Sequence, residues 1–206
     1  MRFKYKIVGF RIGTEFAANY LSNTFYKHFL TMRNNRALIV IVSLIICVTV
    51  LYTYTKAQEQ PKKPLGKIDK VLVLKSERKM QLIKNGEVVR TYKIALGNNP
   101  IGHKQKEGDE RTPEGNYVLD WRNEQSHYYK SMHISYPNAE DKRQAKAKNV
   151  SPGGNIMIHA LPNGMGYIGT GHTANDWTDG CIAITNEQMD ELWGSASNGT
   201  PIEIKP

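Results

Sequence analysis

Residues 71–96, VLVLKSERKMQLIKNGEVVRTYKIAL, decide the class of fold. Apolar residues recur there in short segments divided by polar ones, a pattern typical of strands rather than helices. Asn85-Gly86 is a strong hairpin signal, because both residue types tolerate the positive φ of a two-residue turn. The sequence therefore predicts a domain that begins with β-strands, at 71–74, 80–83 and 88–96.

Later apolar segments also have strand length, and Gly, Pro and Asn separate them. They cover residues 117–121, 132–136, 156–159, 181–185 and 202–204. One amphipathic helix is predicted at 187–195, because Thr185 and Gln188 have the spacing of a capping box. A weaker helical pattern covers 141–148. We predict a mainly β fold, a sandwich or barrel with one or two short helices.

The segment from Ala37 to Thr55 is uncharged and apolar, and it approaches the roughly 20 residues that cross a bilayer as a helix. Basic residues dominate before it, which places the N-terminus in the cytoplasm. We predict a cytoplasmic tail at 1–36, a transmembrane signal anchor at 37–55, a linker at 56–69 and an exported domain at 70–206. The alternative is a signal peptide cleaved after Ala57, which yields a secreted protein.

The net charge of +9 is concentrated in the N-terminal tail. Residues 1–36 hold seven basic residues and one acid, and so contribute +6 of that total. Nucleic-acid binding requires basic residues clustered on the folded domain itself. The charge therefore predicts no nucleic-acid partner.

Cys181 is predicted to be an unpaired thiol in an exported domain, since the other cysteine, Cys47, lies in the apolar segment. An odd cysteine in an oxidising compartment indicates either a buried thiol or a reactive one. In residues 176–186 (DWTDGCIAITN), Gly180 directly precedes Cys181 and leaves the approach to the sulfur open. Amide N–H groups at these two residues are candidates for stabilising an oxyanion.

A thiol becomes a good nucleophile when an imidazole accepts its proton. His159 is the best candidate, because it ends the predicted strand 156–159 and emerges at a Gly- and Pro-containing loop, where catalytic groups often lie. Taken alone, His159 fits a structural histidine as well as it fits a catalytic one. Cys181 taken alone also fits a small buried apolar residue. Together they favour a cysteine–histidine active site.

These residues resemble the signature of the L,D-transpeptidase (YkuD-type) catalytic domain. In that family a histidine precedes a Ser/Thr-His-Gly-Cys element closed by an asparagine. Here Ile158-His159 is followed by Thr178-Asp179-Gly180-Cys181-Ile182 and Asn186. Arg111–Tyr117 (RTPEGNY) is similar to the family's Thr-Pro-x-Gly turn, and 199–202 (GTPI) to its closing strand. The resemblance covers roughly residues 70–206.

The resemblance implies a cell-envelope enzyme that remodels peptidoglycan stem peptides, which the predicted anchor at 37–55 would hold at the membrane. Cys181 would form an acyl-enzyme, and His159 would act as general base and then acid. The family attacks the bond after the third stem residue and releases the terminal D-alanine. It passes the acyl group to an amine or, in carboxypeptidase-type members, to water. No metal or organic cofactor is implied, and the oligomeric state stays open.

The sequence departs from the family pattern near the nucleophile. Asp179 replaces a histidine, Ala183 replaces a common arginine, and Ala160 replaces a glycine. The loop 162–177 is longer than usual in the family. It contains His172, which could act as a second imidazole near the sulfur, although its position in a loop favours a solvent-exposed side chain. We expect the substrate-binding residues to be Thr178, Asp179, Gly180 and His172.

Two other functions are consistent with parts of the sequence. A zinc hydrolase could use His159, His172, Cys181 and an aspartate, but no His-Glu-x-x-His or Cys-x-x-Cys element is present in the sequence. A non-catalytic envelope-binding module would make Cys181 a core residue. Such a binding module would not explain why Gly180 and Cys181 follow directly after Asp179. His133 is read as one face of a strand that a substrate groove could include.

Overall fold

The structure is a computed structural model that describes residues 36–58 and 64–206. The predicted cytoplasmic tail lies outside the described residues except for its last position, as does the central part of the predicted linker, residues 59–63. The N-terminal helix and the folded domain are separate units and are described separately.

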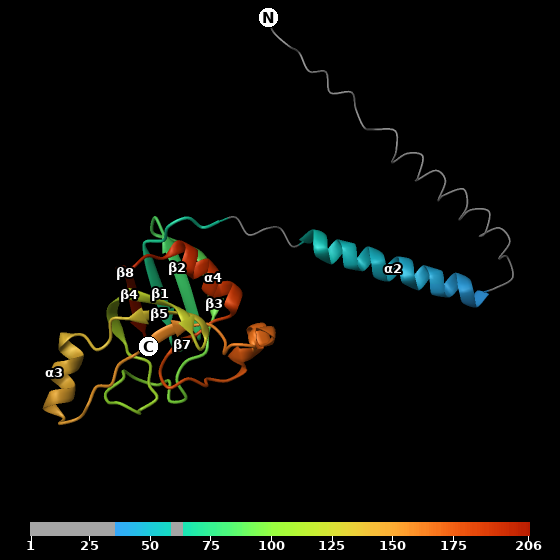
Figure 1. The fold of residues 1–206 in the computed structure, drawn as a ribbon. Coiled ribbons are helices and arrows are strands. Elements are labelled where there is room, and N and C mark those ends of the chain that lie inside the picture. The colour runs from blue at the N-terminus through green and yellow to red at the C-terminus, as the bar shows by residue number, and fades with distance from the viewer. Residues whose placement is uncertain (1–35, 59–63) are drawn as a thin grey trace, which may run out of the picture. The chain divides into compact units, whose positions relative to one another are not determined.

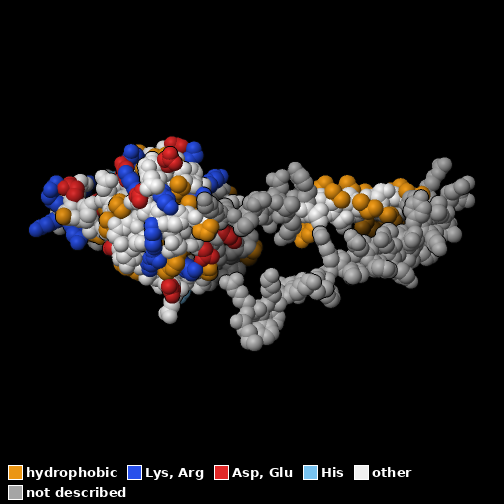
Figure 2. Space-filling view, turned by 90° about the horizontal axis from the view of Figure 1, so that it is seen from above, with side chains coloured by type: hydrophobic (Ala, Val, Ile, Leu, Met, Phe, Trp, Pro, Cys, Tyr) orange, Lys and Arg blue, Asp and Glu red, His pale blue; other side chains and the backbone are white. Residues whose placement is uncertain are grey.

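Helix α2 covers Arg36–Gln58, so the apolar segment is helical as expected. Hydrophobic side chains are exposed along it, among them Leu44 and Val48 (Figure 2). Across residues 36–58 and 64–206, however, no helix is both long enough and apolar enough to span a membrane. The structure therefore gives no support to the predicted transmembrane segment at 37–55.

The folded domain is mainly β, and its described residues form one sheet of eight strands in the order β3-β2-β1-β8-β4-β5-β6-β7 (Figure 1). The strands are β1 (Lys70–Leu74), β2 (Lys79–Lys84), β3 (Glu87–Lys93), β4 (Gly115–Ser126), β5 (Tyr129–Ile134), β6 (Met157–His159), β7 (Ile182–Ala183) and β8 (Thr200–Lys205). The pairs β1–β8 and β6–β7 are parallel, and the other pairs are antiparallel.

The sheet is curled, so its two ends meet. Ala95, just after β3, forms an antiparallel bridge with Ala183 of β7, and Gly97 bridges Thr178. The backbone of Ala95 and Ala183 exchanges both hydrogen bonds, at 3.1 and 2.9 Å. The short strand β7 is therefore held on both sides, by β6 and by the segment after β3.

The predicted hairpin is confirmed. Asn85 and Gly86 have φ of 52° and 79° and join β2 to β3, as the two-residue turn requires. The third predicted strand is shorter than expected, because residues 94–97 leave β2 and pair instead with the segment around β7.

Both predicted helices are present. Helix α4 (Asn186–Ser195) begins at a capping box between Thr185 and Gln188, and its buried face, with Met189 and Leu192, covers the core. Helix α3 (Ala139–Ala147) is capped by Asn138 and Asp141. A 3₁₀ helix, η1 (Gly166–Ala174), occupies the enlarged loop 162–177, where no helix was predicted.

Lys75 fixes the long connection between β3 and β4. Its side chain is 3% exposed, and Nζ donates to the carbonyls of Gly102 and Thr112 and to Glu114, at 2.7, 2.9 and 2.8 Å. Burial lowers the pKa of Lys75, while its hydrogen bond to Glu114 opposes that shift. Removing either partner of such a buried ion pair lowers the free energy of unfolding strongly. The pair therefore holds this connection in one conformation.

Candidate active site

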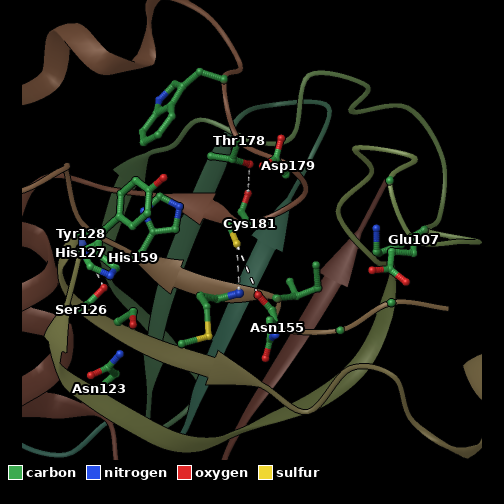
Figure 3. A pocket seen from close by; sticks show the side chains of 18 residues that line it. Glu107, Asn123, Ser126, His127, Tyr128, Asn155, His159, Thr178, Asp179 and Cys181 are labelled. Carbon is green, nitrogen blue, oxygen red and sulfur yellow. Dashed lines mark hydrogen bonds between the residues drawn. The ribbon is translucent and has the colours of Figure 1, made fainter. Parts of the chain in front are cut away.

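A cavity of about 590 Å³ opens on the face of the sheet that carries Cys181 and His159 (Figure 3). This volume lies within the range usual for ligand sites. Its walls come from the β4–β5 turn, strand β6, the 104–108 and 153–156 loops, and the segment before β7.

The strand register explains how the two predicted catalytic residues meet. Ile158 pairs with Ile182, and His159 with Ala183, in the parallel pair β6–β7. Ile158 and Ile182 are fully buried in the core. Side chains alternate along a strand, so Cys181 and His159 project from the opposite face, as diagonal neighbours on adjacent strands. The structure thus places Cys181 and His159, the predicted nucleophile and base, on one face of the sheet and in one pocket.

The Cys181 thiol is half-buried and lies against the backbone of the loop before β6. Its Sγ accepts a hydrogen bond from the Met157 amide at 3.4 Å and donates to the Asn155 carbonyl at 3.7 Å (Figure 3). Burial raises the pKa of Cys181. The Met157 amide opposes this shift, Asp179 adds to it, and Lys104 opposes it. The resting group is therefore a thiol at neutral pH.

His159 is 4% exposed and is oriented by its neighbour, Ala160. Its Nδ1 lies 2.7 Å from the Ala160 carbonyl, which can only accept, so Nδ1 carries the proton and Nε2 is the basic nitrogen. The ring packs against Tyr128 and Trp177, with centroids 4.4 and 5.5 Å away. Burial lowers the pKa of His159 to about 4, the Ala160 hydrogen bond opposes this, and His172 adds to it. His159 is therefore neutral at pH 7, as a general base must be.

Thr178 and Gly180 fix the turn that precedes the nucleophile. The Thr178 hydroxyl donates to the Cys181 carbonyl at 2.8 Å and accepts from the Gly180 amide at 3.2 Å. The Gly180 amide is thus already bonded, which leaves the Cys181 amide as the candidate oxyanion donor of the predicted pair. Asp179 is exposed at the pocket wall, where it is accessible to a substrate.

His172 is buried, so the expectation of a solvated loop residue is wrong. Helix η1 turns its ring inward, edge-on to Trp177 with centroids 6.4 Å apart. Neither ring nitrogen has a hydrogen-bond partner, and burial lowers the pKa of His172. The side chain is not part of the pocket lining, although its charge would influence His159.

Sequence reasoning missed several residues of the pocket. Lys104 is buried there with its Nζ 2.8 Å from Asp109, and Tyr128 covers His159. No local pattern marks either residue. For Asn155 the sequence does contain a signal, because the run Gly153-Gly154-Asn155 is typical of a turn. Asn155 has a positive φ in that turn, and its carbonyl oxygen accepts from Sγ of Cys181.

The three other histidines of residues 64–206 lie elsewhere in the domain. His127 lies at the pocket wall. His133 contacts Asp120 on the neighbouring strand, and His103 contacts Asp141 beneath α3. Among the described residues, no group of three or more His, Cys, Asp or Glu is arranged to hold a metal ion.

The pKa directions predict how Cys181 reacts with iodoacetamide. Because only the thiolate reacts and the thiol pKa is raised, we expect the alkylation rate to rise by about tenfold from pH 7 to 8 and to keep rising toward pH 9. Asp179→Asn removes a negative charge beside the sulfur and should increase the rate at pH 8. A plateau between pH 5 and 8 would instead indicate a preformed thiolate–imidazolium pair.

The domain is a curled β-sheet with a half-buried cysteine and a neutral, buried histidine on one face. These features place it in the class of β-domains with a cysteine–histidine site. Within that class the family is clear. Residues 68–204 match the YkuD model, the L,D-transpeptidase catalytic domain, and the chain belongs to this family.

Individual relatives agree with this assignment. The chain is 30% identical over 171 residues to "Putative L,D-transpeptidase YafK" of Escherichia coli (strain K12), a match that covers 76% of this chain and 61% of the relative. The chain therefore spans less than two thirds of that relative's length.

Solved structures are also similar to this chain. The helical cell shape determining protein Pgp2 from Campylobacter jejuni has 25% identity and a TM-score of 0.50, over 68% of this chain and 48% of that one. Bd1075 from Bdellovibrio bacteriovorus has 26% identity and a TM-score of 0.49, over 70% of this chain and 50% of that one.

Proposed function

We propose that this protein is an L,D-transpeptidase that acts on peptidoglycan stem peptides through an acyl-enzyme on Cys181. The observation that carries the proposal is the placement of Cys181 and the neutral His159 on one face of β6–β7, in a single pocket. Family membership supports the substrate class, and similarity to Pgp2, a helical cell shape determining protein, supports a role in the cell wall.

The first half-reaction would form a thioester. Nε2 of His159 accepts the thiol proton as Sγ attacks the carbonyl carbon of the third stem residue. The amide of Cys181 is placed to stabilise the oxyanion that forms. The imidazolium then gives its proton to the departing amine, and D-alanine leaves. Because the pKa of His159 is about 4, the imidazolium is short-lived and transfers its proton readily.

The second half-reaction would regenerate the enzyme. An amine of another stem attacks the thioester, His159 accepts the proton of that amine, and the proton returns to Sγ as the thiolate leaves. If water attacks instead, the same residues perform a carboxypeptidase reaction. Asp179, exposed at the pocket wall, is placed to attract a cationic amine.

We propose that the catalytic domain works outside the cytoplasmic membrane, where peptidoglycan lies. The uncharged segment 37–55 and the basic residues before it support export, as a signal anchor or as a signal peptide cleaved after Ala57. Protease accessibility of residues 64–206 in intact spheroplasts tests this placement. Protection of the domain until the cells are lysed would overturn it.

The activity is tested by mass spectrometry of the full chain incubated with tetrapeptide stems. We expect loss of terminal D-alanine, an acyl adduct on Cys181, and either a cross-linked product or a free tripeptide, which identifies the acceptor. Cys47→Ala is the matched control, because that cysteine lies on α2, and it should keep full activity. Unchanged stems with a folded protein would reject the proposal and favour the binding module.

A further inference from the structure

Trp121 forms an exposed aromatic surface beside the pocket. It is 41% exposed, and one face stacks on the His133 ring, with centroids 5.0 Å apart and planes 16° from parallel. His133 Nδ1 is 2.7 Å from Asp120, and because a carboxylate only accepts, Nδ1–H is the donor. Trp121, His133 and Asp120 are called the aromatic platform below. No step of the proposed reaction uses it.

A β-bulge creates the platform. Leu119 pairs with Ile134 and Arg122 with Met132, so Asp120 and Trp121 together oppose His133. Two residues opposite one is the signature of a bulge, which redirects side chains from their usual alternation. Here both side chains of the bulge reach His133, so the platform results from the backbone and is not a chance rotamer of one surface residue.

The platform lies on the same face of the sheet as the thiol. Sγ of Cys181 contacts the Met157 amide, Met157 pairs with His133, and His133 contacts Trp121. These contacts cross β7, β6, β5 and β4 in turn. Adjacent strands lie about 4.8 Å apart, so His133 is roughly 10 Å from the nucleophile and Trp121 roughly 14 Å.

The platform lies next to the pocket wall along β4 and β5. Asn123 and Ser131 form a cross-strand pair in the pocket wall (Figure 3 labels Asn123). Trp121 and His133 are the residues two positions along each strand, and so occupy the next place on this face. A substrate that extends past this wall along β4 and β5 would therefore meet the platform.

We propose that the aromatic platform binds the sugar to which the stem peptide is attached, a proposal that rests on the function given above. Three residues separate the attacked carbonyl from the sugar, and an extended chain of three residues spans at most about 11 Å. That reach ends near His133, roughly 10 Å from the thiol, so the sugar attached beyond it would lie over Trp121, roughly 14 Å away. A sugar has a face of C–H groups that can stack on an aromatic ring. The hydroxyls at its edge can donate hydrogen bonds to a carboxylate such as that of Asp120.

Two substrates separate this role from general support of the fold. The full chain should show a KM for disaccharide-tetrapeptide roughly three- to tenfold below its KM for free tetrapeptide, and Trp121→Ala should erase that difference. Trp121→Phe should restore most of it, because a ring remains. Tyr167→Ala is the matched control, since this residue is 85% exposed and outside the pocket wall, and it should leave both KM values unchanged.

Binding is measured independently of turnover by titrating a trimer of β-1,4-N-acetylglucosamine into the full chain carrying Cys181→Ala. We expect a saturable change in tryptophan fluorescence that the added Trp121→Ala removes. If sugar binds through Trp121 while stems remain unprocessed, the proposed reaction fails and the platform stands. If stems are processed but the sugar neither binds nor lowers KM, or if Trp121→Ala raises both KM values equally, the platform proposal is overturned.

Discussion

Cys181→Ala is expected to lower kcat by roughly 10⁴-fold or more, since removing a nucleophile leaves only binding and oxyanion stabilisation. Stability should change little, by less than about 1 kcal/mol, because the thiol is half-buried, lies outside the core cluster and makes only two long hydrogen bonds. Stem turnover and urea denaturation of the same preparation measure the two effects.

Ile182→Ala is the matched control for a core role. Ile182 is the next residue, is 0% exposed and belongs to the core, so its truncation should cost about 2 to 5 kcal/mol. If Cys181→Ala destabilised the protein to a similar extent and stems were not processed by the wild type, Cys181 would be a structural residue.

Gly180→Ala is expected to damage both folding and activity. Gly180 has φ of +120°, and a Cβ there would lie 2.5 Å from the Arg111 carbonyl, so backbone must move. We expect a loss of stability of more than about 2 kcal/mol from strain and overlap. Because Cys181 follows directly, displacement of this turn by about 1 Å should reduce kcat/KM by roughly 100-fold.

Gly199→Ala separates strain from overlap. Gly199 also has a positive φ, +88°, but a Cβ there meets nothing within 4 Å. It should cost about 1 to 2 kcal/mol and keep its kcat/KM. Full activity in Gly180→Ala would show that contact with Arg111 does not position the nucleophile. Denaturation curves and stem turnover of both variants provide the comparison.

Local signals in the sequence predicted much of this domain. The Asn85-Gly86 turn and the capping box of α4 appear as expected, because each depends on residues adjacent along the chain. The sequence also singles out Cys181 and His159, because each lies at the end of a recognisable strand, and the structure places both in one pocket.

Features that depend on distant pairing could not be predicted. Nothing in residues 200–205 indicates that β8 inserts between β1 and β4. Likewise, the burial of His172 follows from how η1 folds back, and the bonded state of the Gly180 amide follows from the Thr178 rotamer. The small side chain at position 183 is explained only by the structure, because Ala183 is fully buried where its backbone bridges to Ala95.

That bridge links the chemistry of the protein to its folding. The two residues of β7 are too few to stay in place alone, and Ala183 depends on Ala95, which lies far away in the sequence. Contacts between such distant segments form only after a large loop has closed, which is entropically costly. A chain whose sheet is still open lacks the bridge that holds β7, so we expect Cys181 to reach its position beside His159 only when the ends of the sheet have joined.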